Sequence, residues 1–258
     1  MKLLVSVVDN EEALEAVEGG ADIVDVKNPG EGSLGANFPW IIKEIRRSVS
    51  QHVEVSATIG DMPNLPGTAA LAALGAAEAG ADYVKVGLLG PRTCGEATFL
   101  MKCLCKAVKD FNPETGVIAA AYADFRDIGS ISLSDLPKVA SASGADGVLV
   151  DIENKRDRKL FDYIEEKEIN YLVERSHDLG LSVALAGLLG IEDVVRCFNL
   201  GVDIFGVRRS ACEGGDRVRG RVRREYVRTL SDVIRSLATT SNGIQMLPRQ
   251  AYCGHLKA

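Results

Sequence analysis

The chain has 258 residues, of which 46% are hydrophobic and only 5% aromatic, and its formal net charge is −6 at pH 7. This length and apolar content are enough for one substantial core. The acidic balance gives no bulk electrostatic reason to expect nucleic acid or an anionic membrane as a partner. The opening MKLLVSVVDNEE has too short an apolar run for a signal peptide, and no later segment is long enough to span a membrane. We therefore expect a soluble cytoplasmic protein.

The six cysteines and three histidines are scattered along the chain. The cysteines are Cys94, Cys103, Cys105, Cys197, Cys212 and Cys253. No two of them form a C-x-x-C pair, so their spacing does not predict a zinc site, and a disulfide framework is not expected in a chain of this size. We expect most of them to act as small apolar residues and expect no metal site.

Short β-branched runs alternate with longer Ala-, Leu- and Glu-rich stretches throughout the chain. The expected strands are residues 2–7, 22–27, 53–58, 82–87, 117–122, 146–151, 181–187 and 203–208. The expected helices are residues 10–19, 37–49, 67–80, 93–110, 133–143, 166–179, 190–200 and 221–237. Eight such units predict an α/β fold, a single-domain (β/α)₈ TIM barrel over residues 1–238 with a short C-terminal tail, 239–258. A doubly wound sheet is the alternative, but its glycine fingerprint is absent after the first strand.

A repeated pattern supports the barrel. The segments GGADIVDV, AGADYVKVG, SGADGVLVD and LGVDIFGV each place a glycine and then an aspartate directly before a strand. The aspartates are Asp22, Asp82, Asp146 and Asp203. Their spacing corresponds to two βα units per repeat, so these segments are the even-numbered strands. The glycine fits the end of the preceding helix, and the aspartate begins the strand.

Side-chain alternation assigns a face to each residue of these four strands. One parity is wholly apolar: Val24, Val26, Val84, Val86, Val148, Val150, Phe205 and Val207. We expect these residues to meet the outer helices. The opposite parity places Asp25, Lys85, Leu149 and Gly206 in one layer, and Lys27, Gly87, Asp151 and Arg208 in the next. The charged residues must then point into the barrel.

The upper of these layers lies at the C-terminal mouth, where barrel enzymes carry their active sites. A structural ion network is the alternative interpretation. It is less attractive because buried ion pairs stabilise poorly, and inert barrels fill these layers with Val, Ile and Leu.

Two lysines inside one barrel suggest amine chemistry. A partly desolvated lysine near a second cation loses proton affinity and can form a Schiff base with a carbonyl. Lys27, nearer the mouth, is the expected nucleophile, and Lys85, level with Asp25, is the expected proton-transfer group. Asp25 could hold either ammonium or exchange protons itself. Lys155, four residues after Asp151, could reach over the mouth or could be a solvated loop charge.

The last two expected strands run into glycine-rich loops, LAGLLG and GVRRSACEGGDRVRGR. Loops at these positions commonly bind phosphate in barrels, because glycines let backbone N–H groups approach an anion. The expected phosphate-binding residues are Gly187, Gly206, Arg208, Gly214, Gly215 and Asp216. Arg209 and Arg217 could add charge. An ordinary glycine-rich turn is the alternative, and the following arginine run predicts a solvated helix face rather than an RNA site.

Other residues near strand ends are weaker candidates. Asp61 follows the third strand, and Tyr122 and Asp124 lie at the end of the fifth. Each could equally serve as a turn or capping residue. In the long loop 28–40, Ser33 could contact a ligand.

Three motifs are long and unusual: VDVKNPGEGSLGANFPW, YVKVGLLG and GVRRSACEGGDR. They resemble those of the (5-formylfuran-3-yl)methyl phosphate synthases, also called 4-(hydroxymethyl)-2-furancarboxaldehyde-phosphate synthases. The likeness runs over about residues 1–237. This family acts in the biosynthesis of methanofuran or the related methylofuran, for one-carbon metabolism.

The resemblance implies a TIM barrel that condenses two molecules of glyceraldehyde 3-phosphate to a furan, with loss of phosphate and water. It implies that Lys27 forms the Schiff base and that Lys85 accepts a proton. Asp25, Asp151 and Lys155 match further family positions, of which Lys155 has the least similar flanks. The implied reaction is that of a carbon–oxygen lyase and requires no metal or organic cofactor.

Two alternatives stay open at this point. One is a class I aldolase-like enzyme on another phosphosugar, and the other is a non-catalytic barrel that binds a phosphorylated metabolite. The expected partner is a small phosphorylated aldehyde, with no nucleic acid and no membrane. We also expect a homo-oligomer of unspecified subunit number.

Overall fold

A computed structural model describes residues 1–155 and 158–243, and in it eight parallel strands form one closed barrel. The strands are β1 (Lys2–Val7), β2 (Ile23–Val26), β3 (Glu54–Asp61), β4 (Tyr83–Gly87), β5 (Gly116–Tyr122), β6 (Gly147–Asp151), β7 (Ser182–Leu185) and β8 (Ile204–Val207). They follow chain order around the barrel, and β8 pairs with β1 to close it. The predicted TIM barrel is therefore confirmed, and the doubly wound alternative is wrong.

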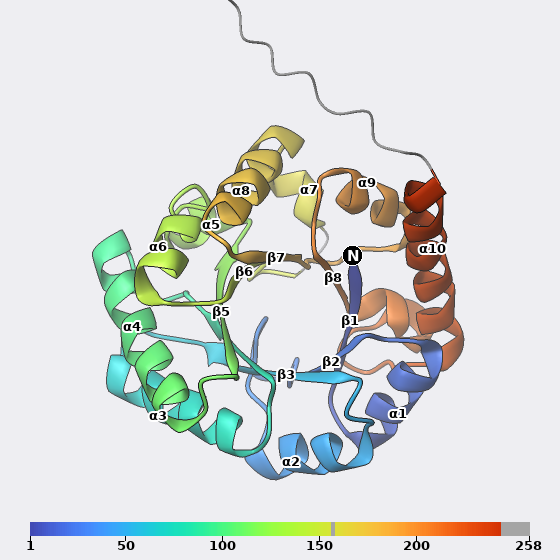
Figure 1. Ribbon diagram of the computed structural model, residues 1–258, viewed down its shortest axis with the longest axis horizontal. Helices are drawn as coiled ribbons and strands as arrows, with labels where there is room; N and C mark the ends of the chain where they lie inside the picture. The colour runs from blue at the N-terminus through green and yellow to red at the C-terminus, as the bar shows by residue number, and fades with distance from the viewer. Residues whose placement is uncertain (156–157, 244–258) are drawn as a thin grey trace, which may run out of the picture.

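Helices surround the strands as a ring (Figure 1). The principal ones are α1 (Asn10–Gly19), α2 (Pro39–Ser48), α3 (Pro66–Glu78), α4 (Cys94–Phe111), α6 (Leu136–Ser143), α8 (Glu166–Asp178), α9 (Val194–Asn199) and α10 (Arg224–Gly243). Short turns of helix are α5 (Phe125–Ile128), α7 (Leu160–Tyr163), η1 (Ile191–Asp193), η2 (Arg209–Ala211) and η3 (Glu213–Gly215). In the described parts of the chain, none of these helices combines the length and apolar character needed to cross a bilayer.

Three helices begin three or four residues later than expected, and one of them is the helix expected from residue 133, which begins at Leu136. The helix expected from residue 190 begins at Val194, because the preceding residues form the 3₁₀ turn η1. The last helix begins at Arg224 instead of residue 221, because Val222 still bridges to Cys212. It continues to Gly243, past the expected domain end at 238. Residues 244–258 of the expected tail lie outside the described residues.

The repeated aspartates join neighbouring strands at the N-terminal end of the barrel. The carboxylates of Asp22, Asp82, Asp146 and Asp203 accept hydrogen bonds from the backbone N–H groups of Leu3, Val55, Val117 and Val183, at 2.7–2.8 Å. In return, the backbone N–H of each aspartate donates to the carbonyl of the residue whose N–H its carboxylate accepts. The repeat thus ties every even strand to the odd strand before it, which explains the pattern structurally.

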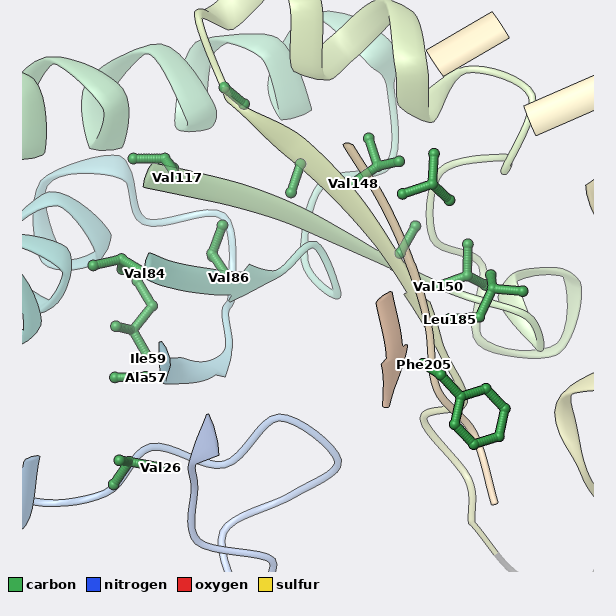
Figure 2. Packing of buried hydrophobic residues seen from close by; sticks show 14 of the residues in the cluster. Val26, Ala57, Ile59, Val84, Val86, Val117, Val148, Val150, Leu185 and Phe205 are labelled. Carbon is green, nitrogen blue, oxygen red and sulfur yellow. The ribbon is translucent and has the colours of Figure 1, made fainter. Parts of the chain in front are cut away.

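The two faces of the strands divide as side-chain parity predicts. All eight apolar residues of the outward parity belong to the large buried cluster between the barrel and the helices. Figure 2 shows part of this layer, including Val84, Val86 and Val148. Inside the barrel a smaller cluster contains Ile118, Leu149 and Ala184. The remaining inward positions are mostly polar, and they build the site described next.

Candidate active site

A carboxylate–lysine pair occupies the middle of the barrel. Lys85 Nζ lies 2.6 Å from Asp25 Oδ1, and both side chains are buried. The hydroxyls of Ser6 and Ser56 donate to the two oxygens of Asp25, at 2.9 and 2.8 Å. The strand register explains this convergence, because Asp25 sits directly between Ser6 on β1 and Ser56 on β3. Asp25 is thereby held in one orientation with every oxygen hydrogen-bonded.

Burial and charge act in opposite directions on this pair. Burial lowers the pKa of Lys85, while the Asp25 carboxylate opposes that change. Burial alone would raise the pKa of Asp25, but the charges of Lys85 and Lys27 hold it below its usual value. Asp25 is therefore ionised, and Lys85 gives up its proton more readily than a lysine in water.

A second pair lies one layer higher, at the mouth. Lys155 Nζ is 2.6 Å from Asp151 Oδ2, and Lys27 Nζ is 3.8 Å from the same oxygen. Lys155 is buried, so the solvated-loop interpretation of this residue is wrong. Burial lowers the pKa of Lys155 to about 7, against the opposing pull of Asp151 and with help from the charges of Lys27 and Arg217.

These residues line a cavity at the C-terminal mouth with an empty volume of about 340 Å³. Its wall contains Lys27, Asp151 and Lys155 together with residues at the ends of β7 and β8. Asp25 and Lys85 are not part of that wall and lie one layer deeper. Lys85 instead borders an enclosed, mainly apolar space toward the N-terminal end of the barrel.

Of the six residues predicted to bind phosphate, some line the cavity and others lie outside its wall. Gly187 and Gly206 line the cavity. Gly187 has a φ of +108°, and a Cβ there would come within 2.9 Å of the Ile152 side chain, so both the turn and the space require glycine. The next residue, Leu188, also lines the cavity and has a φ of +57°, an uncommon and strained value for leucine. Such strain is typical of functional sites.

Arg208 also lines the cavity, but its guanidinium is already engaged. It donates to Glu12 Oε2 at 2.8 Å, to the Ser6 carbonyl at 2.9 Å and to the Arg217 carbonyl at 2.6 Å. These bonds make Arg208 a buried link between β1, α1 and the loop after β8. Few of its donors remain for an anion.

Gly214, Gly215 and Asp216 are not among the residues that line the cavity. The Asp216 carboxylate accepts hydrogen bonds from the backbone N–H groups of Val218 and Arg219, at 2.8 and 3.1 Å. This is the geometry of a turn residue. The turn matters to the site indirectly, because Arg217, which directly follows Asp216, lines the cavity.

Sequence reasoning missed the two serines that hold Asp25. A signal was present, since Ser6 and Ser56 are polar residues at inward positions of strands that are otherwise buried and apolar. The weaker candidates have supporting contacts. The Tyr122 hydroxyl donates to Asp61 at 2.5 Å, and Asp61 in turn accepts the N–H of Leu34, which fastens the loop after β2. Asp124 accepts the N–H groups of Glu153 and Asn154.

Within residues 1–155 and 158–243, no cluster of three or more His, Cys, Asp or Glu side chains has the arrangement of a metal site. The chemical groups that the described mouth offers are two lysine amines, one carboxylate, three arginines and the backbone at glycines. This set suits carbonyl and phosphate chemistry.

Solved structures of other proteins share this fold. The 3-hexulose-6-phosphate synthase of Salmonella typhimurium has a TM-score of 0.65 and 19% identity, covering 92% of this chain and 99% of that one. KGPDC from Streptococcus mutans has a TM-score of 0.61 and 16% identity, covering 91% of this chain and 97% of that one. At such identities the likeness concerns the fold alone.

Sequence relatives are far closer. The family model described as 4-HFC-P synthase matches residues 3–231. The (5-formylfuran-3-yl)methyl phosphate synthase of Methanopyrus kandleri is 51% identical over 233 residues, covering 90% of this chain and 98% of the relative. The one of Methanocaldococcus jannaschii is 48% identical over 233 residues, covering 90% and 99%. The chain therefore belongs to the (5-formylfuran-3-yl)methyl phosphate synthase family.

Proposed function

We propose that this protein condenses two molecules of glyceraldehyde 3-phosphate to (5-formylfuran-3-yl)methyl phosphate, as a Schiff-base lyase. The observation that carries the proposal is the position of Lys27. Its amine faces a small cavity, 3.8 Å from a carboxylate that also binds the Lys155 ammonium. The product name comes from the relatives of the chain, and the substrate from the resemblance of its motifs to their family.

The first step is attack of the Lys27 amine nitrogen on the aldehyde carbon. A carbinolamine forms and loses water to give a protonated imine, which makes the adjacent C–H acidic. Asp151 supports this step because its carboxylate stabilises the iminium charge and holds Lys155 beside it. Lys155, with its pKa near 7, can protonate the carbinolamine hydroxyl as it leaves as water, and can take a proton back later.

The second step removes the acidic proton and gives an enamine. We assign the proton to Lys85, as the family resemblance implies. Burial favours its neutral form, and Asp25 holds its amine in place at 2.6 Å. Lys85 lies one layer below the cavity wall. The substrate carbon must therefore reach down from the layer of Lys27 and Asp151 toward the layer of Lys85.

Formation of a carbon–carbon bond then joins the imine-bound triose to the second triose phosphate. A hydroxyl closes the ring, phosphate leaves, water is lost, and hydrolysis of the imine returns the Lys27 amine. In total, two triose phosphates yield one furan phosphate, one phosphate and two waters. Formation of the aromatic ring makes the sequence favourable, and phosphate contacts remote from the reacting carbons provide binding energy.

The test combines product and adduct analysis. Incubation with glyceraldehyde 3-phosphate should produce a compound that absorbs in the near ultraviolet, and borohydride with peptide mass mapping should find the adduct on Lys27. Lys27→Ala should abolish both signals while the protein still folds. Lys106→Ala, at an exposed position on α4, is the matched control and should behave as wild type. An adduct on Lys85 would reverse the two roles.

The same experiment distinguishes the alternative functions. An aldolase-like enzyme would give the adduct but a product without the furan absorbance. A non-catalytic barrel would give neither adduct nor product. Either result would contradict the proposed reaction.

A further inference from the structure

Arg217 crosses the mouth of the barrel, and among residues 1–155 and 158–243 no carboxylate forms a salt bridge with it. It lies in the loop between β8 and α10, and its side chain lines the same cavity as Lys27, Asp151 and Lys155. Its side chain donates a hydrogen bond of 3.3 Å from Nη2 to the carbonyl of Gly32, in the loop after β2. The guanidinium is therefore held over the cavity by one long bond.

Three other arginines of the same segment are paired with carboxylates. Arg208 binds Glu12, Arg221 binds Asp9, and Arg223 binds Glu213, at 2.6–2.9 Å. Within the described residues, Arg217 has no carboxylate within the 4.0 Å of a salt bridge. It is nonetheless partly withdrawn from solvent, with Asp151 and Asp61 near enough to act on its charge. A guanidinium has five N–H donors, so most of those of Arg217 remain to be satisfied.

The backbone of Arg217 is, in contrast, firmly placed. Its carbonyl accepts the Nε–H of Arg208 at 2.6 Å, and the turn around it is closed by Asp216. Because Arg208 is itself anchored to Glu12, the side chain of Arg217 starts from a fixed point and is free only at its end. Arg217 is therefore a positioned cation that lacks an anion among the residues that the structure describes.

We propose that Arg217 binds a phosphate group of the substrate across the mouth, separately from the backbone at Gly187 and Gly206. The inference rests on the proposed function, in which two phosphorylated trioses occupy one cavity and one phosphate is expelled. One glycine-lined pocket accommodates one phosphate, and a second dianion needs a second cation. Arg217 meets that need, because a planar guanidinium can hold two phosphate oxygens at once.

The hydrogen bond from Arg217 to Gly32 should break when phosphate binds. When a phosphate binds the guanidinium of Arg217, the hydrogen bond to the Gly32 carbonyl is replaced by stronger, charge-assisted hydrogen bonds to phosphate oxygens. Arg217 thus substitutes one partner for another as substrate enters. Arg209 also lines the cavity, but it is exposed.

The test measures binding of inorganic phosphate by calorimetry, which does not depend on furan formation. Arg217→Ala should weaken phosphate binding by about 10- to 100-fold, the loss expected when a charged hydrogen-bond partner is removed. Arg217→Lys keeps the charge without the planar fork and should lose less. The matched control is Arg219→Ala, two residues along the same turn and exposed, which should bind phosphate as wild type.

Unchanged phosphate affinity in Arg217→Ala, or equal losses in Arg217→Ala and Arg219→Ala, would overturn the proposal. Wild-type protein that does not bind phosphate would also overturn it. A protein that binds phosphate through Arg217 but forms no furan would leave this inference intact and refute the proposed reaction. If Arg217→Ala does not fold, Arg217→Lys decides, since wild-type affinity in that variant would argue against a bidentate contact.

Discussion

At the scale of the residue, the barrel interior holds charges that water would otherwise solvate. Asp25, Lys85, Lys27 and Asp151 are all at least 96% buried by side chain and backbone together. Each carboxylate has an ammonium at 2.6 Å, and the hydroxyls of Ser6 and Ser56 complete the shell of Asp25. Such an arrangement costs desolvation energy that apolar packing would avoid, which is why it points to function rather than stability.

The pair of Asp25 and Lys85 should be strongly coupled. Asp25→Asn keeps the shape but leaves the buried Lys85 without a counter-charge, so we expect the free energy of unfolding to fall by about 3–5 kcal/mol. Combining it with Lys85→Met should cost much less than the sum of the two single changes. Urea unfolding of the four proteins checks this, and additive losses would show that the pair is not coupled.

The lowered pKa of Lys155 should appear as a pH dependence of stability. The pKa is about 7 in the folded protein and ordinarily 10.5, so between these values the unfolded chain binds more protons. The stability of wild type relative to Lys155→Met should therefore rise with pH, by at most about 1.4 kcal/mol per unit, and level off below pH 7. Urea unfolding at several pH values tests this. A difference that does not change with pH would contradict it.

At the scale of the element, the two ends of the barrel have different tasks, stability at the N-terminal end and chemistry at the C-terminal end. The aspartate before an even strand ties the N-terminal end, and the inward residues at the C-terminal end build the cavity. In helix α4, Thr93 and Glu96 form a capping box that begins the helix directly after the β4 loop. This separation allows loops to change at the mouth while the opposite end maintains the barrel.

Asp82 tests that division of tasks. Asp82→Ala removes the acceptor for the Val55 N–H and the ion pair with Arg46, so we expect a loss of about 1–3 kcal/mol in stability. Asp82→Asn keeps an acceptor and should lose less. Turnover of the folded variants should equal that of wild type, because Asp82 lies at the end remote from the cavity. Reduced turnover at full folding would show that the two ends communicate.

At the scale of the whole molecule, a buried ion pair joins the first helix to the loop after the last strand. Glu12 on α1 accepts Arg208 at 2.8 Å and also the backbone N–H of Val8 at 3.0 Å. Helix α10 lies beside α1 and completes the ring (Figure 1). The barrel closes only when these distant segments meet, so this contact belongs to the molecule and not to any one element.

Removing this link should weaken the entire barrel. Glu12→Ala leaves the Arg208 guanidinium buried and unpaired, with an expected loss of about 3–5 kcal/mol. The neighbouring Glu11 has a side chain that is 89% exposed, and Glu11→Ala should cost less than about 1 kcal/mol. Thermal unfolding of both variants tests the contrast. Equal melting temperatures would mean that Glu12 does not hold the barrel closed.

The amino-acid pattern alone determined the fold and the inward set of residues. Strand side chains alternate with a period of two, and the glycine–aspartate repeat marks the even strands, so the inward positions of Asp25, Lys27, Lys85 and Asp151 follow from local rules. Roles within that set, such as the imine at Lys27, stay predictions.

Tertiary structure alone decided which loop residues reach the cavity. Arg208 and Arg217 look alike in the sequence, but Glu12, 196 positions away from Arg208, neutralises the first and not the second. Gly214, Gly215 and Asp216 fall in a turn beside the cavity instead of in its wall. The reason is that loop paths and long-range ion pairs depend on how the closed barrel brings distant segments together, which no local period encodes.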